Sequence, residues 1–122
     1  MKKKNTILCT SRNYDQVTQL AKIRNLKLVI AGKHGGSKPH DKLNASVHRT
    51  KLLSTKIKKF SPDITISCCS PEAARGSYGL GIPHICFSDS PHATAVMRLV
   101  IPLVQRLLIP WIIPKKNSQN LE

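Results

Sequence analysis

The segment Ser88–His92 holds the side chains of this sequence that are best suited to acid–base chemistry. Asp89 and His92 stand three residues apart around Ser90-Pro91. An imidazole in this setting can serve as a general base or can hydrogen-bond a sugar hydroxyl, which makes His92 the candidate catalytic residue. The alternative is structural, with Asp89 or Ser90 capping the next helix and His92 in its exposed first turn.

A second polar segment, Ser70-Pro71-Glu72, has the composition of a helix start that could also hold a ligand. The Ser70 hydroxyl and the exposed amides of the first turn can be offered to an anionic group or a sugar. The alternative is that Ser70 only caps the helix and that Glu72 only favours the helix dipole. Pro71 suits the first helical position in either case.

Two further segments follow predicted strands and could line the same ligand site. Ser11 and Arg12 follow the first strand, and the loop Gly32–Pro39 (GKHGGSKP) follows the second. Glycines such as Gly35 and Gly36 let backbone amides approach a phosphate or sugar closely. The loop has neither the Walker spacing nor G-x-G-x-x-G, so a plain flexible connection is the competing interpretation.

These polar segments are positioned by strands that alternate with helices. The predicted strands are Thr6–Thr10, Leu26–Ala31, Ile64–Cys68, His84–Ser88 and Arg106–Ile109. The predicted helices are Tyr14–Arg24, Leu43–Phe60, Pro71–Leu80 and Pro91–Val100. This alternation predicts an α/β fold, a three-layer Rossmann-like parallel sheet covered by helices on both faces. The polar turns then share the carboxyl edge of the sheet, where such folds bind ligands.

The long predicted helix Leu43–Phe60 is amphipathic. We expect its buried stripe to consist of Leu43, Val47, Leu53, Ile57 and Phe60. Arg49 and the lysines lie off this stripe and are expected to face solvent. Gly81 suits the end of the helix that begins at Pro71.

The composition indicates one small domain with a strongly basic surface. Among 122 residues, 20 are Lys or Arg and 6 are Asp or Glu, which gives a formal net charge of +14. Nucleic acid, other anions and anionic lipid are therefore candidate partners, against the simpler interpretation of a solvated basic surface. Aromatic residues make up only 4% of the chain, which leaves little for base stacking and disfavours nucleic acid.

Cysteine use and hydropathy bear on the location of the protein. The four cysteines form no C-x-x-C pair, and three of them lie in or at the end of predicted buried strands, so we expect small, reduced core residues and no cofactor. The alternative is a metal site of Cys68, Cys69, His84 and Cys86, whose spacing is poor for ligation. Cys68 and Cys69 are adjacent and should point to opposite faces of a strand. The apolar segment Met97–Ile113 is interrupted by charges and prolines, which predicts no membrane span, although Lys115 and Lys116 leave peripheral membrane contact open. No secretory signal is evident, so we predict a cytoplasmic protein.

Several motifs together resemble known families. Residues 61–110 are similar to the amino-terminal domain of GT-B glycosyltransferases and of UDP-N-acetylglucosamine 2-epimerases. The segments TSRNYDQV (Thr10–Val17), GKHGG (Gly32–Gly36) and SPEAARGSYGLGIPHICFSDSPHA (Ser70–Ala93) more closely resemble an uncharacterised archaeal family, domain of unknown function 354. This resemblance covers about residues 6–114, nearly all of the predicted elements.

The resemblance implies a domain organisation and a chemistry. Residues 6–113 would be a partial GT-B amino-terminal domain lacking its first strand–helix unit, with a basic extension over 1–5 and a disordered tail over 114–122. The implied ligand is a sugar or nucleotide sugar, and the implied parent reaction is glycosyl transfer or epimerisation. Because the second nucleotide-sugar domain has no counterpart here, the chain is expected to be inactive alone. The alternatives are an interaction module that completes a split enzyme and a small basic protein that binds nucleic acid or other anions.

Overall fold

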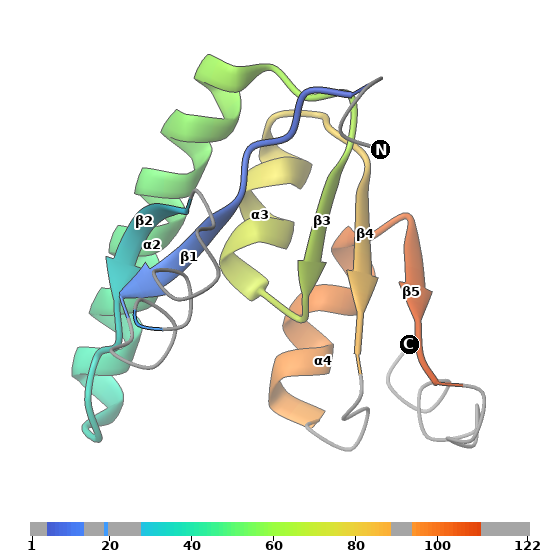
Figure 1. Cartoon of the computed structure of the whole chain (residues 1–122). Helices are drawn as coiled ribbons and strands as arrows, with labels where there is room; N and C mark the ends of the chain where they lie inside the picture. The colour runs from blue at the N-terminus through green and yellow to red at the C-terminus, as the bar shows by residue number, and fades with distance from the viewer. Residues whose placement is uncertain (1–4, 14–18, 20–27, 89–93, 111–122) are drawn as a thin grey trace. The chain divides into compact units, whose positions relative to one another are not determined.

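The computed structural model describes residues 5–13, 19, 28–88 and 94–110, and it is a mixed α/β structure. The chain divides into two compact units, Met1–Leu52 and Leu53–Glu122, each of which is described by itself (Figure 1). The strands are β1 (Thr10–Asn13), β2 (Val29–Lys33), β3 (Thr65–Cys68), β4 (His84–Phe87) and β5 (Arg106–Leu108). The helices are α2 (Pro39–Phe60), α3 (Pro71–Gly79), α4 (Thr94–Val100) and a 3-10 turn at Ile101–Leu103.

All strand pairs are parallel, as predicted, but the strands form two sheets. The first unit holds β1 and β2, and the second holds three strands in the order β3-β4-β5. The α/β class is therefore confirmed in its coarse form. Of the helix predicted over Tyr14–Arg24, only Gln19 is described, and it is helical. The tail predicted over 114–122 lies outside the described residues.

Strands β1 and β2 of the first unit begin and end later along the chain than the sequence suggested. Ser11 and Arg12 lie inside β1 rather than in a turn after it, because Thr10 and Ser11 pair with Val29 and Ile30 of β2. Pairing through backbone groups does not depend on apolar side chains, so the polar residues did not end the strand. Gly32 also belongs to β2, although it was expected in the loop, and it precedes Lys33, which pairs with Asn13 after a shift in register.

Helix α2 begins at Pro39, one turn before the expected start at Leu43. Proline is well tolerated there, since its missing N–H has no partner in the first helical turn anyway. The carboxylate of Asp41 in that first turn also favours the positive end of the helix dipole.

The buried face of α2 differs from the predicted apolar stripe. Leu53 and Ile57 are buried as expected, but Leu43 and Val47 are about 60% exposed. Arg49, expected in solvent, is 8% exposed, and its Nε donates a hydrogen bond to the Ala31 carbonyl oxygen at 3.0 Å. A buried guanidinium is tolerated when its donors are satisfied, and its aliphatic stem packs like an apolar side chain.

Two glycines allow the chain around β2 to lie directly against α2. Gly32 has a φ of +83°, and a Cβ there would stand 3.0 Å from Cβ and Cγ of Arg49. A Cβ on Gly35 would stand 2.6 Å from the backbone oxygen of Asp41 and 2.8 Å from Cβ of Ala45. A Cβ on Gly35 therefore cannot be accommodated without a backbone shift, and a Cβ on Gly32 would require the stem of Arg49 to move by a few tenths of an ångström.

The second unit is built on one face of its parallel sheet. Helices α3 and α4 lie together behind strands β3, β4 and β5 in Figure 1. The core between them consists of Ala74, Cys86 and Val100, which are fully buried. Ile66, Phe87 and Leu108 are at least 43% exposed, so within the described part of this unit the helices do not cover both sheet faces as predicted.

The start and end of α3 confirm the sequence-based expectation. Ser70 is the N-cap, its hydroxyl accepts a hydrogen bond from the Ala73 N–H at 3.2 Å, and Pro71 occupies the first turn. Gly81 follows the helix with a φ of +72°, a conformation that glycine adopts without strain.

A buried imidazole joins β3, β4 and α3. His84 is 1% exposed, its Nδ1 lies 2.6 Å from Thr65 Oγ1, and its Nε2 lies 2.8 Å from Ser67 Oγ. Thr65 Oγ1 in turn lies 2.6 Å from the hydroxyl of Ser77 on α3. Burial lowers the pKa of His84 from its ordinary value of 6.5, because removal from water disfavours the charged ring.

Within the described residues, no helix has both the length and the apolar character needed to cross a membrane.

The packing of Gly32 predicts a difference between two otherwise similar variants. Gly32 and Gly36 both have φ near +85°, so Gly32→Ala and Gly36→Ala should each lose about 1–2 kcal/mol of unfolding free energy through backbone strain. A Cβ at Gly36 meets open space, whereas one at Gly32 meets Arg49. Gly32→Ala should therefore lose roughly 1–3 kcal/mol more in urea denaturation. Equal losses in the two variants would contradict the packing role of Gly32.

The lowered pKa of His84 predicts acid sensitivity. The unfolded state binds a proton near pH 6.5 and the folded state only at lower pH, so the unfolding free energy should fall as the pH drops below that value. The stability due to this residue is fully present above about pH 6.5. Replacement by glutamine should reduce the slope of unfolding free energy against pH, measured between about pH 7 and pH 5. His40→Gln, on the exposed first turn of α2, is the control, and a slope unchanged by His84→Gln would contradict the prediction.

Candidate functional site

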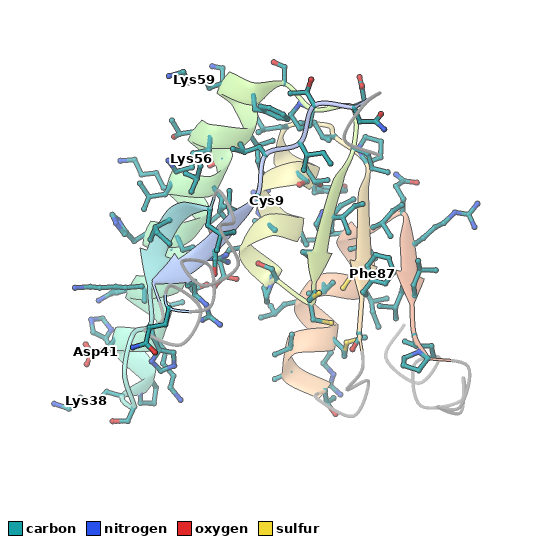
Figure 2. The ribbon with its side chains drawn as sticks, viewed as in Figure 1. Cys9, Lys38, Asp41, Lys56, Lys59 and Phe87 are labelled. Atoms are coloured by element: carbon teal, nitrogen blue, oxygen red, sulfur yellow. The ribbon has the colours of Figure 1, made fainter. Side chains whose placement is uncertain are left out.

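The first unit contains an open pocket of about 510 Å³ at the end of β2. It is formed by the last residue of the strand, the glycine loop and the first turns of α2. We call it the glycine-loop pocket, and its lining residues are Lys33, His34, Gly35, Gly36, Asp41, Asn44, Ala45 and His48. Figure 2 places Asp41 and Lys38 at this end of α2 and Lys56 and Lys59 toward its other end.

The pocket is rich in hydrogen-bond donors. Lys33 contributes an ammonium group from the exposed end of β2. His34 accepts a hydrogen bond from the Gly36 N–H on Nδ1 at 3.1 Å, so the neutral ring carries its proton on Nε2, where it can donate. The amino-terminal end of α2 adds a partial positive charge. This set of groups suits an anion such as a phosphate.

The pocket also has groups that can hydrogen-bond neutral hydroxyls. Asp41 is the carboxylate in its lining, and Asn44 contributes an amide whose Nδ2 lies 3.2 Å from Nε2 of His40. A carboxylate and an amide beside cationic groups are typical of sites that bind a polar ligand carrying both charge and hydroxyls.

The predicted residues of the first unit are only partly brought together. Gly35 and Gly36 line the pocket, but Gly35 is explained by its contact with α2 and the Gly36 N–H is engaged by His34. Ser11 and Arg12 are half-buried within β1 and are absent from the pocket lining; the Ser11 hydroxyl donates to the Arg12 carbonyl oxygen at 3.1 Å. Direct contact of these residues with a ligand stays a prediction.

In the second unit, Ser70, Pro71 and Glu72 form the start of α3. Ser70 Oγ accepts from Ala73 and donates to Glu72 Oε2 at 3.3 Å. The Ser70 N–H donates to Ser67 Oγ, also at 3.3 Å. These bonds are those of the capping interpretation, and a ligand role is untested. Asp89, Ser90 and His92 lie outside the described residues.

The sequence-based reasoning missed most residues of the pocket. Asp41, Asn44 and His48 occupy one face of α2 at spacings of three and four residues, which is a detectable helical pattern. Asp41 was missed because the helix was expected to begin at Leu43, whereas Asn44 and His48 lie inside the expected helix and were not considered as site residues. Among the described residues, no group of three or more His, Cys, Asp or Glu side chains is arranged to hold a metal ion.

Comparisons with known proteins identify relatives of this chain. A family model described as "Protein of unknown function (DUF354)" matches residues 1–121. The uncharacterized protein MJ0665 of Methanocaldococcus jannaschii is 33% identical over 103 residues, which are 84% of this chain and 30% of that protein. The chain thus spans less than a third of the length of this relative. No solved structure matches.

Because the family model covers nearly the whole chain, this protein belongs to the family of proteins of unknown function DUF354.

Proposed function

We propose that the glycine-loop pocket binds a phosphate-bearing sugar or sugar nucleotide. The observation that carries this proposal is the position of the pocket, where a cationic side chain, a glycine loop and a helix amino terminus meet at the carboxyl end of a parallel strand. That edge is the usual ligand-binding edge of α/β sheets. The pocket volume of 510 Å³ lies within the range of small-molecule sites.

The chemistry of the lining favours a sugar phosphate over a bare polyanion. Lys33 and the Nε2–H of His34 would contact the phosphate oxygens. Asp41 would accept hydrogen bonds from sugar hydroxyls, and Asn44 can donate or accept there. The ligand would therefore place its anionic group near β2 and its hydroxyls along α2.

Within a larger protein, we propose that this chain supplies one wall of a GT-B-like site. The support is the similarity of residues 61–110 to GT-B amino-terminal domains together with the parallel α/β elements. MJ0665 is more than three times as long as its matched segment, which leaves room for a second nucleotide-sugar domain in family members. Glycosyl transfer or epimerisation would then require groups beyond the glycine-loop pocket.

A second candidate function is binding of an anionic polymer such as nucleic acid. The observation that favours it is the net charge of +14, with Lys51, Lys58 and Lys59 exposed along the second half of α2. Such binding would rest on many exposed charges rather than on a pocket.

The pocket proposal predicts a site-specific loss of binding. By isothermal titration with UDP-N-acetylglucosamine, Lys33→Ala should weaken binding about fivefold, because an exposed charge contact contributes up to about 1 kcal/mol. Lys59→Ala removes the same charge from the far part of α2 and should leave the affinity unchanged (Figure 2). Equal losses for both variants, or no binding to the wild-type chain, would contradict the pocket.

Salt dependence separates the two candidate functions. Binding of a charged polymer through about three phosphate contacts should weaken roughly 40-fold between about 50 and 200 mM salt. Binding of the nucleotide sugar in the glycine-loop pocket should weaken far less, since uncharged hydrogen bonds contribute to it. Fluorescence anisotropy with a labelled oligonucleotide measures the polymer binding. Tight, salt-sensitive oligonucleotide binding without sugar-nucleotide binding would favour the anionic-polymer function over the pocket.

A further inference from the structure

Three sulfur atoms from three elements of the second unit converge in its core. The Cys86 thiol on β4 lies 3.4 Å from the sulfur of Cys69, in the turn after β3. The Cys69 sulfur lies 3.6 Å from Sδ of Met97 on α4. The sulfurs thus form a chain of donors and acceptors, Cys86 to Cys69 to Met97.

Ordinary core packing accounts for the burial of this cluster but not for the position of Cys69. Cys86 and Met97 are fully buried, as small thiols and flexible thioethers often are. Cys69, however, has a φ of +50°, which costs a non-glycine residue about 1–2 kcal/mol. It is also only half-buried, which gives the cluster a route to solvent. Glycine or asparagine would suit this backbone better, so the thiol occupies a position that favours other residues.

We propose that Cys69, Cys86 and Met97 form a binding site for the soft, thiophilic cation Cu(I). Two thiolates and one thioether are soft ligands that suit Cu(I) and disfavour hard cations. In the part of the chain that the structure describes, no group of three or more His, Cys, Asp or Glu side chains is arranged to hold a metal ion. The described residues therefore offer no competing nitrogen- or oxygen-rich site for Zn²⁺.

The sulfur spacings suit a three-coordinate ion. With a metal–sulfur distance of about 2.3 Å, the two measured separations correspond to S–metal–S angles of roughly 95° and 103°. Opening of each pair by a few tenths of an ångström would bring these angles close to trigonal. The half-buried Cys69 turn can make this adjustment more easily than β4 or α4 can.

Binding must displace the protons of both thiols. In the structure the Cys86 thiol donates to the Cys69 sulfur, and the Cys69 thiol donates to Sδ of Met97. The step is a simple exchange in which two S–H bonds break, two Cu–S bonds form, two protons pass to solvent, and Met97 adds a lone pair. Neither copper nor sulfur changes oxidation state. Only a strongly thiophilic ion can drive this exchange.

Cu(I) titration of the reduced full chain under anaerobic conditions, against a chromophoric Cu(I) chelator, tests the proposal. The wild-type chain should bind one Cu(I) in competition with the chelator. Its Cu(I) affinity should be higher than that of any variant that lacks one of the three sulfur ligands. Cys69→Ser and Cys86→Ala should each weaken binding by more than about tenfold, and Met97→Leu by less. Zn²⁺ in the same assay should bind far more weakly than Cu(I).

The matched controls are Cys9→Ser and Cys68→Ser, which remove exposed thiols outside the cluster. Both should retain the wild-type Cu(I) affinity. Met97→Leu keeps the volume and apolar character of the side chain, so it tests ligation even where Cys86→Ala proves unstable by circular dichroism. Equal Cu(I) affinity of wild type, Cys69→Ser and Met97→Leu would overturn the proposal, as would loss of binding in Cys68→Ser alone.

Discussion

The close approach of the glycine loop to helix α2 is the constraint on which the candidate site depends. Gly32 admits the stem of Arg49, whose Nε satisfies the Ala31 carbonyl oxygen, and Gly35 lets the loop lie against the backbone of Asp41. This contact fixes the end of β2 beside the amino terminus of α2. The cationic end of the strand and the polar first turns of the helix thereby line one pocket. Without this contact between the glycine loop and α2, Lys33 and Asp41 would lie on separate surfaces.

In the second unit, the main constraint is that polar groups are buried inside a small core. Hydroxyls of β3 contact both nitrogens of His84, and the hydroxyl of Ser77 extends this chain to α3. The sulfur cluster lies farther along the same face of the sheet, toward the carboxyl ends of the strands, where Cys86 follows His84 by two residues. One sheet face thus carries a structural polar network and, beside it, the proposed soft-metal site.

The sequence predicted the α/β class, the parallel strands and the Ser70-Pro71 start of α3, because these depend on local alternation and capping. It did not predict the inward position of Arg49, since that depends on the space left by Gly32, a neighbour from another element. Likewise Thr65, Ser67 and His84 resemble ordinary strand residues until the register pairs Thr65 with His84 and brings Ser67 within hydrogen-bond distance of the same ring. Of the pocket residues, the sequence indicated Gly35 and Gly36, and the misplaced helix start hid Asp41.

The central claim is that the glycine-loop pocket holds an anionic sugar, and amide chemical-shift mapping by NMR tests it most directly. On titration with UDP-N-acetylglucosamine, we predict saturable shifts concentrated at residues 33–36 and in the first turns of α2. The shifts should be small at Lys56 and Lys59, which carry the same charge farther along the helix (Figure 2). Shifts that spread evenly over the lysines of α2, or that miss the pocket altogether, would contradict the account.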